Sequence, residues 1–280
     1  MLVDVAHYNL PTRREHFWRI PRYLRSPLGP VYLRPTSPYT LPKRSRSGVC
    51  RLDRIRRQRI TSALADGGDL TVNTRVNQCQ KPTGLFGRFT LRNMNSRHSK
   101  VTDWGLSHIS IPIEGSILDV GCGGGRTVSK LAAATEGKVY GVDHSKESFA
   151  VAGQVNQQWI EIGRVEIREG CVSQLPFSED VFDLVTAVET HFWWSDLPAD
   201  MREVFRVTKP GGALIVIAEV YKGANTRMAK VCEKFAPQTG MKLLTIDEHR
   251  ELLGKAGYSD VQVMAEPGKG WICAIGRKPF

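Results

Sequence analysis

Apolar and polar positions change period repeatedly along residues 115–280, as alternating strands and helices require. Apolar or alternating runs predict strands over 116–120, 138–142, 164–168, 181–188 and 213–220. Between them, apolar residues three or four positions apart predict helices over 126–134 and 146–160, and one from 197 that stops at 209–212. The helix over 146–160 is expected to have Ser145 as its N-cap and to bury Phe149, Ala152, Val155 and Trp159.

The end of the chain carries clear helix and hairpin signals. Residues Thr245–Glu248 form a capping box that opens a helix, and Gly257 is expected to end it. Two strands follow over 258–264 and 271–277, and the short link Pro267–Gly268 predicts a hairpin with an antiparallel last strand. The whole pattern predicts an α/β fold with a doubly wound, mostly parallel sheet of seven strands. Such sheets bind ligands beyond the carboxyl ends of their strands, so the functional loops should follow residues 120, 142, 169 and 188.

Residues 1–80 differ in composition from the rest of the chain. They hold 15 Lys and Arg against 5 Asp and Glu, whereas residues 81–280 hold 24 against 23. The net charge of +11 therefore comes almost entirely from the first 80 residues, which also hold 7 of the 15 prolines. Frequent prolines without a sustained apolar period predict a disordered Arg/Pro-rich extension over 1–80 and a folded domain over 81–280.

Three interpretations of this extension stay open. It is an extension without function that begins at an upstream start codon, an organellar transit peptide, or an arginine-rich arm for nucleic acid or an anionic surface. No apolar run approaches the roughly 18 residues that a membrane span needs. We expect the protein in the cytoplasm, or in an organelle if the extension is a transit peptide.

The loop after the first predicted strand, Asp119–Gly125, is rich in glycine and carries the first sign of a ligand site. Glycine lets the backbone turn sharply and lets a ligand approach closely. The dinucleotide pattern G-x-G-x-x-G fails here because its sixth position is Arg126, whereas acid-x-Gly-x-Gly-x-Gly fits. Asp143 ends the second strand, where a carboxylate can accept both hydroxyls of a ribose. The loop and this acid together indicate a nucleoside site.

At these residues the sequence resembles the class I S-adenosylmethionine-dependent methyltransferases of the small-molecule type. The resemblance spans about residues 84–280 and rests on four motifs in the family's order. They are Ile117–Gly125, Gly141–Asp143, Leu175–Phe177 with Phe182–Val185, and Arg202–Gly212. The resemblance implies a Rossmann-like methyltransferase fold, S-adenosylmethionine as methyl donor, S-adenosylhomocysteine as product and a small-molecule acceptor.

The same resemblance implies cofactor-binding roles for residues at the strand ends. Asp119 would support the glycine loop and face the methionine amino group, Asp143 would hold the ribose, and His144 would lie beside the adenine. Many relatives have an acid after the third strand, and here Cys171 stands in its place, so its backbone or Ser173 would take over the adenine contact. The other cofactor-binding positions are Gly121, Gly123, Gly125, Val172 and Val188.

The loop after the fourth strand, Val188–Asp196, holds most of the candidate acceptor-side residues. We hypothesise that His191 is a general base or orients the acceptor, and the alternative is a histidine that only packs or forms hydrogen bonds. The candidate acceptor-binding residues are Glu189, Trp193, Trp194 and Trp104. Segments 84–110 and 222–244 are expected to cover the site from two sides. Cysteines and histidines are not at metal-ligand spacing, so no metal is implied.

Two other functions stay open. The first is an RNA methyltransferase that uses the basic extension, and the second is a non-catalytic nucleoside-binding protein on the same fold. Nucleic-acid amino methyltransferases usually carry an Asn/Asp-Pro-Pro-aromatic motif after the fourth strand, and Val188–His191 differs from it. The intact glycines and Asp143 argue against loss of the cofactor site.

Overall fold

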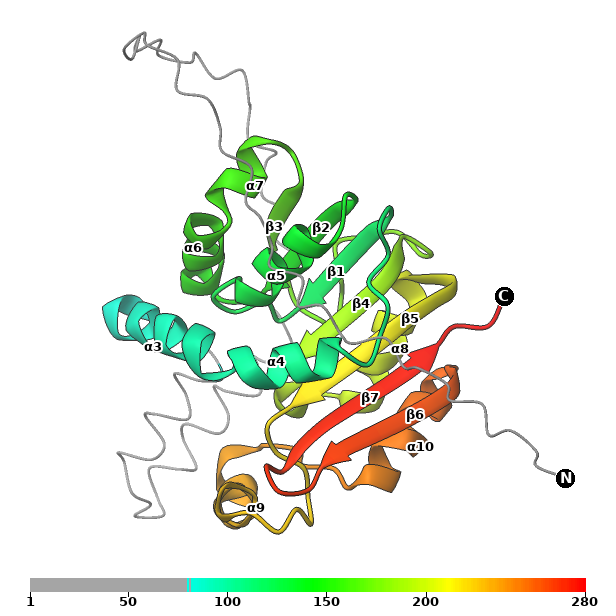
Figure 1. Ribbon diagram of the computed structural model, residues 1–280. Coiled ribbons are helices and arrows are strands. Elements are labelled where there is room, and N and C mark those ends of the chain that lie inside the picture. Colours follow the sequence, from blue (N-terminus) through cyan, green and yellow to red (C-terminus); the bar gives the residue numbers. More distant parts are fainter. Residues whose placement is uncertain (1–79, 81) are drawn as a thin grey trace, which may run out of the picture. The chain divides into compact units, whose positions relative to one another are not determined.

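The computed structural model describes residue 80 and residues 82–280, which contain a seven-stranded sheet with helices on both faces (Figure 1). The strand order is β3-β2-β1-β4-β5-β7-β6, and β7 runs antiparallel to both neighbours while the other pairs are parallel. The predicted doubly wound sheet with an antiparallel last strand is confirmed. The strands are β1 Ser116–Val120, β2 Lys138–Asp143, β3 Val165–Glu169, β4 Phe182–Val188, β5 Thr208–Ala218, β6 Ser259–Glu266 and β7 Trp271–Arg277.

The helices in the described part of the chain connect these strands or precede β1. Those before β1 are α3 Gly84–Arg97 and α4 Ser99–Leu106. Those after β1 are α5 Arg126–Ala134, α6 Lys146–Val155, α7 Gln157–Glu161, the 3₁₀ turn η1 His191–Trp193, α8 Leu197–Val207, α9 Arg227–Thr239 and α10 Ile246–Ala256. None of the helices in this part of the chain is long and apolar enough to cross a membrane.

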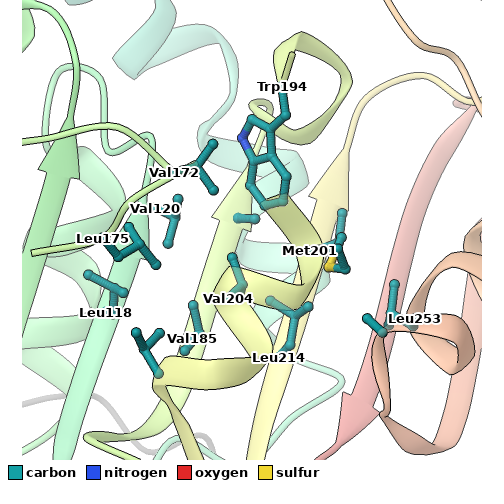
Figure 2. Close-up of a cluster of buried hydrophobic side chains, with 14 of the residues drawn as sticks. Leu118, Val120, Val172, Leu175, Val185, Trp194, Met201, Val204, Leu214 and Leu253 are labelled. Carbon is teal, nitrogen blue, oxygen red and sulfur yellow. The ribbon is translucent and has the colours of Figure 1, made fainter. Parts of the chain in front are cut away.

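Two apolar layers fill the space between the sheet and its helices, because neighbouring strand residues point to opposite faces. Leu118 and Leu214 contribute to the layer under α8 and α10 (Figure 2). Their sequence neighbours Ile117 and Ile215 contribute to the layer under α4, α5 and α6. Since both faces are covered, the parallel strands are apolar on both sides, as their continuous apolar runs predicted.

The segment predicted as one helix over 146–160 is instead two helices with a different buried face. Ser145 caps α6 as predicted, since its hydroxyl accepts from the N–H of Ser148. Ala152 is buried and Trp159 packs against the core, as predicted, but Phe149 is 44% exposed and Val155 is 41% exposed, so that part of the predicted apolar face is wrong. The buried Asn156 interrupts the helix and donates from Nδ2 to the carbonyl of Gly125 at 2.9 Å. Ala152 packs against Gly125 at this point, and a larger side chain would not fit between α6 and the glycine loop.

Two other local predictions have different outcomes. The capping box at Thr245–Glu248 is confirmed, and Gly257 ends α10 with a φ of 111°. The predicted helix stop at 209–212 comes slightly earlier, because α8 ends at Val207 and β5 begins at Thr208. β5 then pairs irregularly with β4 before a regular register starts at Ala213. The prediction of a disordered extension over 1–80 lies outside the described residues, apart from residue 80 itself.

Candidate active site

A cavity opens at the carboxyl-terminal edge of the parallel strands, next to α3 and the start of α4. It is open to solvent on one side and is lined by residues from four strand ends and from α3. The loops after β1, β2, β3 and β4 all contribute to its lining, as the sequence predicted. The cavity is therefore placed by the topology of the sheet rather than by any single motif.

The glycine loop after β1 needs glycine for two different reasons. Gly121, Gly123 and Gly125 have φ angles of 72°, 50° and 78°, which strain any residue with a side chain. A Cβ on Gly125 would also lie 2.7 Å from the Cα of Ala152, because α6 packs directly on the loop. A Cβ on Gly123 would meet nothing nearer than the side chain of Leu91, at 3.7 Å. Gly123 lines the cavity, so it is where a ligand can approach the backbone.

Asp143, at the end of β2, points its carboxylate along the cavity wall. Its Oδ2 accepts from the N–H of Gly123 at 2.9 Å, and its Oδ1 accepts from the N–H of Ser145 at 2.9 Å. Each carboxylate oxygen can accept a second hydrogen bond, so hydroxyl groups of a ligand can still bind there. His144 follows and also lines the cavity.

Asp119 lies beneath the glycine loop and not in the cavity lining. Its side chain is buried, and its Oδ1 accepts from the hydroxyl of Thr186 in β4 at 2.6 Å. Burial raises the pKa of Asp119 to about 7, against the lowering effect of the Thr186 hydrogen bond, and the Asp143 charge adds to the increase. Asp119 thus joins β1 to β4 under the loop, which fits the predicted supporting role better than a direct contact.

The loop after β3 and helix α6 form another part of the lining. Cys171 and Val172 line the cavity next to Val142, which gives this part a largely apolar surface. Ser148 also lines it, and its buried hydroxyl has no hydrogen-bond partner among the described residues. A buried polar group without a partner costs about 1–3 kcal/mol. A polar ligand group at this point would remove that cost.

The inner side of α3 covers the cavity with residues of the predicted covering segment, most of which received no binding role from the sequence. Leu91, Met94, Asn95 and His98 recur at helical spacing and all line the cavity. Asn95 donates from Nδ2 to the carbonyl of Gly124 at 2.9 Å, which attaches α3 to the glycine loop. The predicted covering role of segment 84–110 therefore belongs to α3 and the start of α4.

A polar corner of the cavity lies where α3 meets the ends of β4 and β5. His98 Nε2 lies 3.7 Å from Oε1 of Glu219, and Arg97 donates to the same oxygen at 2.7 Å. Glu189 accepts a short hydrogen bond from the backbone N–H of Glu219. The possible metal-ligand atoms of His98, Glu189 and Glu219 lie within 4.8 Å of one another. Arg97 already balances the charge of Glu219, so we assign no metal to this corner.

The electrostatics of this corner set the protonation of both groups that reach the cavity. Burial lowers the pKa of His98, although the Glu219 carboxylate opposes the shift, so its imidazole is neutral at neutral pH. Burial, and then repulsion by Glu219, raise the pKa of Glu189 well above its ordinary value. A neutral imidazole facing a cavity is a group that can accept a proton.

The remaining predicted residues of the loop after β4 also line the cavity. Val188, Trp193 and Trp194 are all in its wall. The indole N–H of Trp194 donates to the hydroxyl of Thr190 at 3.4 Å, and Thr190 packs against Gly121. The two indoles thus present an aromatic surface beside the polar corner.

Besides Asp119 and Gly125, which lie in or under the glycine loop, two predicted site residues are absent from the cavity lining. His191 is buried, with its Nε2 3.1 Å from Nε2 of His249 in α10, because η1 turns its ring away from the cavity. Trp104 packs against Trp271 of β7, with ring centroids 5.9 Å apart. Segment 222–244, predicted to cover the site, forms α9, which contributes no residue to the described lining.

Sequence reasoning placed His98 in the covering segment without giving it a role, and it did not select Glu219. A signal for His98 was present, because it continues the apolar spacing of Leu91 and Met94 along α3. A signal for Glu219 was also present, since it directly follows β5 and so lies at the ligand-binding edge of the sheet.

Comparison with known proteins points to one family. Residues 118–216 match the family model described as a methyltransferase domain. The chain is 32% identical over 161 residues to methyltransferase GfsG from Streptomyces halstedii, covering 56% of this chain and 58% of that protein. It is 31% identical over 150 residues to demethylmenaquinone methyltransferase from Bacillus licheniformis, covering 49% and 62%. The chain thus spans about three fifths of the length of these relatives.

A solved structure supports the same assignment at the level of the fold. Phosphoethanolamine N-methyltransferase 2 from Haemonchus contortus, in complex with S-adenosyl-L-methionine, superposes with a TM-score of 0.59 at 17% identity, covering 70% of this chain and 57% of that one. The fold is therefore the Rossmann-like methyltransferase fold, and residues 118–216 match a methyltransferase domain. The solved structure binds S-adenosyl-L-methionine.

The residues of the cavity fit this cofactor. Gly123 leaves its backbone open to a ligand, and Asp143 has unused acceptor capacity for ribose hydroxyls. The unpartnered hydroxyl of Ser148 and the apolar surface at Val172 suit a heterocyclic base with polar edges.

Proposed function

We propose that this protein transfers the methyl group of S-adenosylmethionine to a small, partly apolar acceptor molecule. The observation that carries the proposal is the juxtaposition, in one cavity, of a nucleoside-binding wall at Gly123 and Asp143 with an aromatic and polar corner at Trp193 and His98. The relatives named as methyltransferases support the reaction type. S-adenosylmethionine supplies a methyl group that its sulfonium charge has already activated.

The chain's own contribution is mainly orientation. Holding two reactants in line can lower a barrier by about 7–11 kcal/mol. In the proposal, Gly121 and Gly123 hold the cofactor, while Gly125 packs the loop against α6. Asp143 and His144 hold the nucleoside part of the cofactor, and Asp119 supports the loop from beneath. Trp193 and Trp194 position the acceptor, and α3 excludes water from above. Cys171, Val172 and Val188 complete the apolar wall.

We assign proton acceptance to His98 in place of His191. For a hydroxyl acceptor, the proton moves to Nδ1 of His98, because Nε2 faces Glu219. The acceptor oxygen forms the new bond to the methyl carbon, and the electron pair of the broken carbon–sulfur bond stays on sulfur. The Glu219 carboxylate stabilises the imidazolium until water removes the proton.

The pH dependence of this step tests the assignment. A base must be unprotonated, so the rate should rise as the pH passes upward through the pKa of His98. Replacing Glu219 with Gln removes the charge that raises this pKa, so the rise should move to lower pH. NMR titration of His98 in the protein bound to S-adenosylhomocysteine measures the same shift without turnover. The control is Glu251→Gln, which changes an exposed glutamate. An unchanged pKa of His98 in Glu219→Gln would contradict the proposed interaction between His98 and Glu219.

Methyl transfer itself is tested with the full chain and S-adenosylmethionine labelled in its methyl group. The acceptor panel contains phenols, quinols, hydroxy acids, amines and unfractionated RNA. Label in a small molecule supports the proposal. Label in RNA alone favours an RNA methyltransferase that uses residues 1–80. Tight binding of S-adenosylhomocysteine without transfer to any acceptor favours a non-catalytic nucleoside-binding protein. A cytoplasmic location, or an organellar one if residues 1–80 are a transit peptide, stays our prediction.

A further inference from the structure

The outer side of α3 exposes large apolar side chains next to arginines. Leu85 is 84% exposed, Phe89 is 68% exposed and Phe86 is 56% exposed. Arg88 and Arg92 lie on the same side of the helix and are also exposed. Helical spacing places these five residues on one face, which we call the outer face of α3. Large apolar side chains gathered in this way on one surface usually mark an interaction site.

This face belongs to the helix that covers the cavity. The opposite side of the same helix, with Leu91 and Met94, lines the cavity itself. Figure 1 shows α3 and α4 passing across the edge of the sheet where the strands β1 and β4 end. A partner bound to the outer face would therefore contact the helix that covers the cavity.

The charges near this face are mostly positive. Arg88, Arg92 and Lys100 are exposed, and no acidic residue occurs from Gly84 to Thr102. Glu147 of α6 is the carboxylate that reaches this face, where its Oε1 accepts from the N–H of Gly84 at 3.0 Å and its charge interacts with Arg88. Arg92 and Lys100 remain as exposed positive charges. The complementary partner is therefore both apolar and anionic.

Charge complementarity also separates the possible occupants. Residues 1–80 of the same chain hold 15 basic and 5 acidic residues, so they would be repelled by the arginines of α3. A second copy that paired through the same face would bring Arg88 and Arg92 against themselves. A bilayer surface with anionic headgroups satisfies both features, because apolar side chains enter the acyl boundary while arginines stay at the headgroups.

We propose that the outer face of α3 docks this protein on anionic membrane surfaces. The helix lies in the interface and does not span it. Aromatic and aliphatic side chains supply the apolar part, and arginines supply attraction to anionic headgroups. Binding through three side chains and two charges is reversible. The inference concerns a surface outside the cofactor cavity, so it stands or falls independently of the proposed methyl transfer.

The test is co-sedimentation of the full chain with vesicles of phosphatidylcholine alone and of an equimolar mixture with phosphatidylglycerol. We expect binding to the mixed vesicles, and a loss of at least about ten-fold in affinity for Phe86→Ser/Phe89→Ser. The matched control is Ile113→Ser/Ile162→Ser, which removes side chains of similar exposure, 70% and 65%, from other surfaces. This control should bind like the parent protein.

Two further arms deal with residues 1–80 and with self-association. The basic extension binds anionic lipid by charge alone, so high salt weakens its contribution, while the apolar part of α3 binding persists. The comparison of variants is therefore made at high salt as well as low salt. Unchanged affinity for S-adenosylhomocysteine shows that the variant is folded. The proposal is overturned if Phe86→Ser/Phe89→Ser binds vesicles like the parent, if the parent binds none, or if the parent is a dimer in solution that this variant abolishes.

Discussion

The glycine loop offers the sharpest separation between folding and cofactor binding, because two of its glycines face different surroundings. Gly125 packs against α6, where an added Cβ would lie 2.7 Å from the Cα of Ala152 and 2.6 Å from Nδ2 of Asn156. Gly123 faces the cavity, and its added Cβ would have no atom nearer than 3.7 Å. The same chemical change, Gly→Ala, should therefore have different consequences at the two positions.

The magnitudes follow from these contacts. Both positions have positive φ, which costs a non-glycine residue roughly 1–2 kcal/mol. At Gly125 the clash with α6 adds about 1–3 kcal/mol of overpacking, so Gly125→Ala should lower the free energy of unfolding by about 2–5 kcal/mol. Gly123→Ala should lower it by only about 1–2 kcal/mol. However, its methyl group enters the space that we assign to the cofactor and should weaken binding by at least about ten-fold.

Urea unfolding and calorimetric titration with S-adenosylhomocysteine measure the two effects separately. Gly153→Ala is the matched control, because Gly153 lies inside α6 with no atom within 4 Å of its added Cβ. That control should be neutral or stabilised by about 0.5–1 kcal/mol and should bind normally. The reasoning is refuted if Gly123→Ala binds like the parent protein, or if Gly125→Ala is as stable as Gly123→Ala.

Two predictions concern buried polar groups around the site. Burial lowers the pKa of both His191 and His249 below 6.5, so below that pH the unfolded chain takes up protons that the folded pair does not. In urea titrations the free energy of unfolding should be highest above pH 6.5 and should fall as the pH drops. The variant His191→Phe/His249→Leu should show a flatter pH dependence. An equally steep pH dependence in that variant would disprove the role of the two histidines. Thr186→Val leaves the buried Asp119 carboxyl without its hydroxyl donor, so thermal or urea unfolding should show a loss of about 1–3 kcal/mol, and unchanged stability would contradict the link between β1 and β4.

Much of the fold could be predicted from the sequence because strand and helix periods are strong local signals. The capping box at Thr245 and the cap at Ser145 were predictable, since each depends on residues within three positions. The face of α6 was not predictable in this way. Its burial is decided by contact with the glycine loop, which selects small Ala152 over large Phe149.

The candidate site shows the same division between local and distant information. The glycine loop and Asp143 are recognisable because each follows a strand directly. The polar corner depends on residues 122 positions apart, Arg97 and Glu219, which meet only when α3 crosses the end of β5. The orientation of His191 is likewise decided by its contact with His249, 58 positions away in α10. Loop position alone therefore identified the correct loop but the wrong histidine as a cavity residue.

The central claim is that this cavity binds S-adenosylmethionine through Gly123 and Asp143. Calorimetric titration of S-adenosylmethionine and S-adenosylhomocysteine into the full chain tests it most directly, with Asp143→Ala beside Asp183→Ala. Asp183 also accepts a backbone N–H, that of Ser116 at 2.8 Å, but lies at the opposite end of the sheet. We predict binding by the parent and by Asp183→Ala, and a loss of at least about ten-fold in Asp143→Ala, as expected for charge-assisted hydrogen bonds. Equal affinity in Asp143→Ala, or no binding by the folded parent protein, would contradict the account.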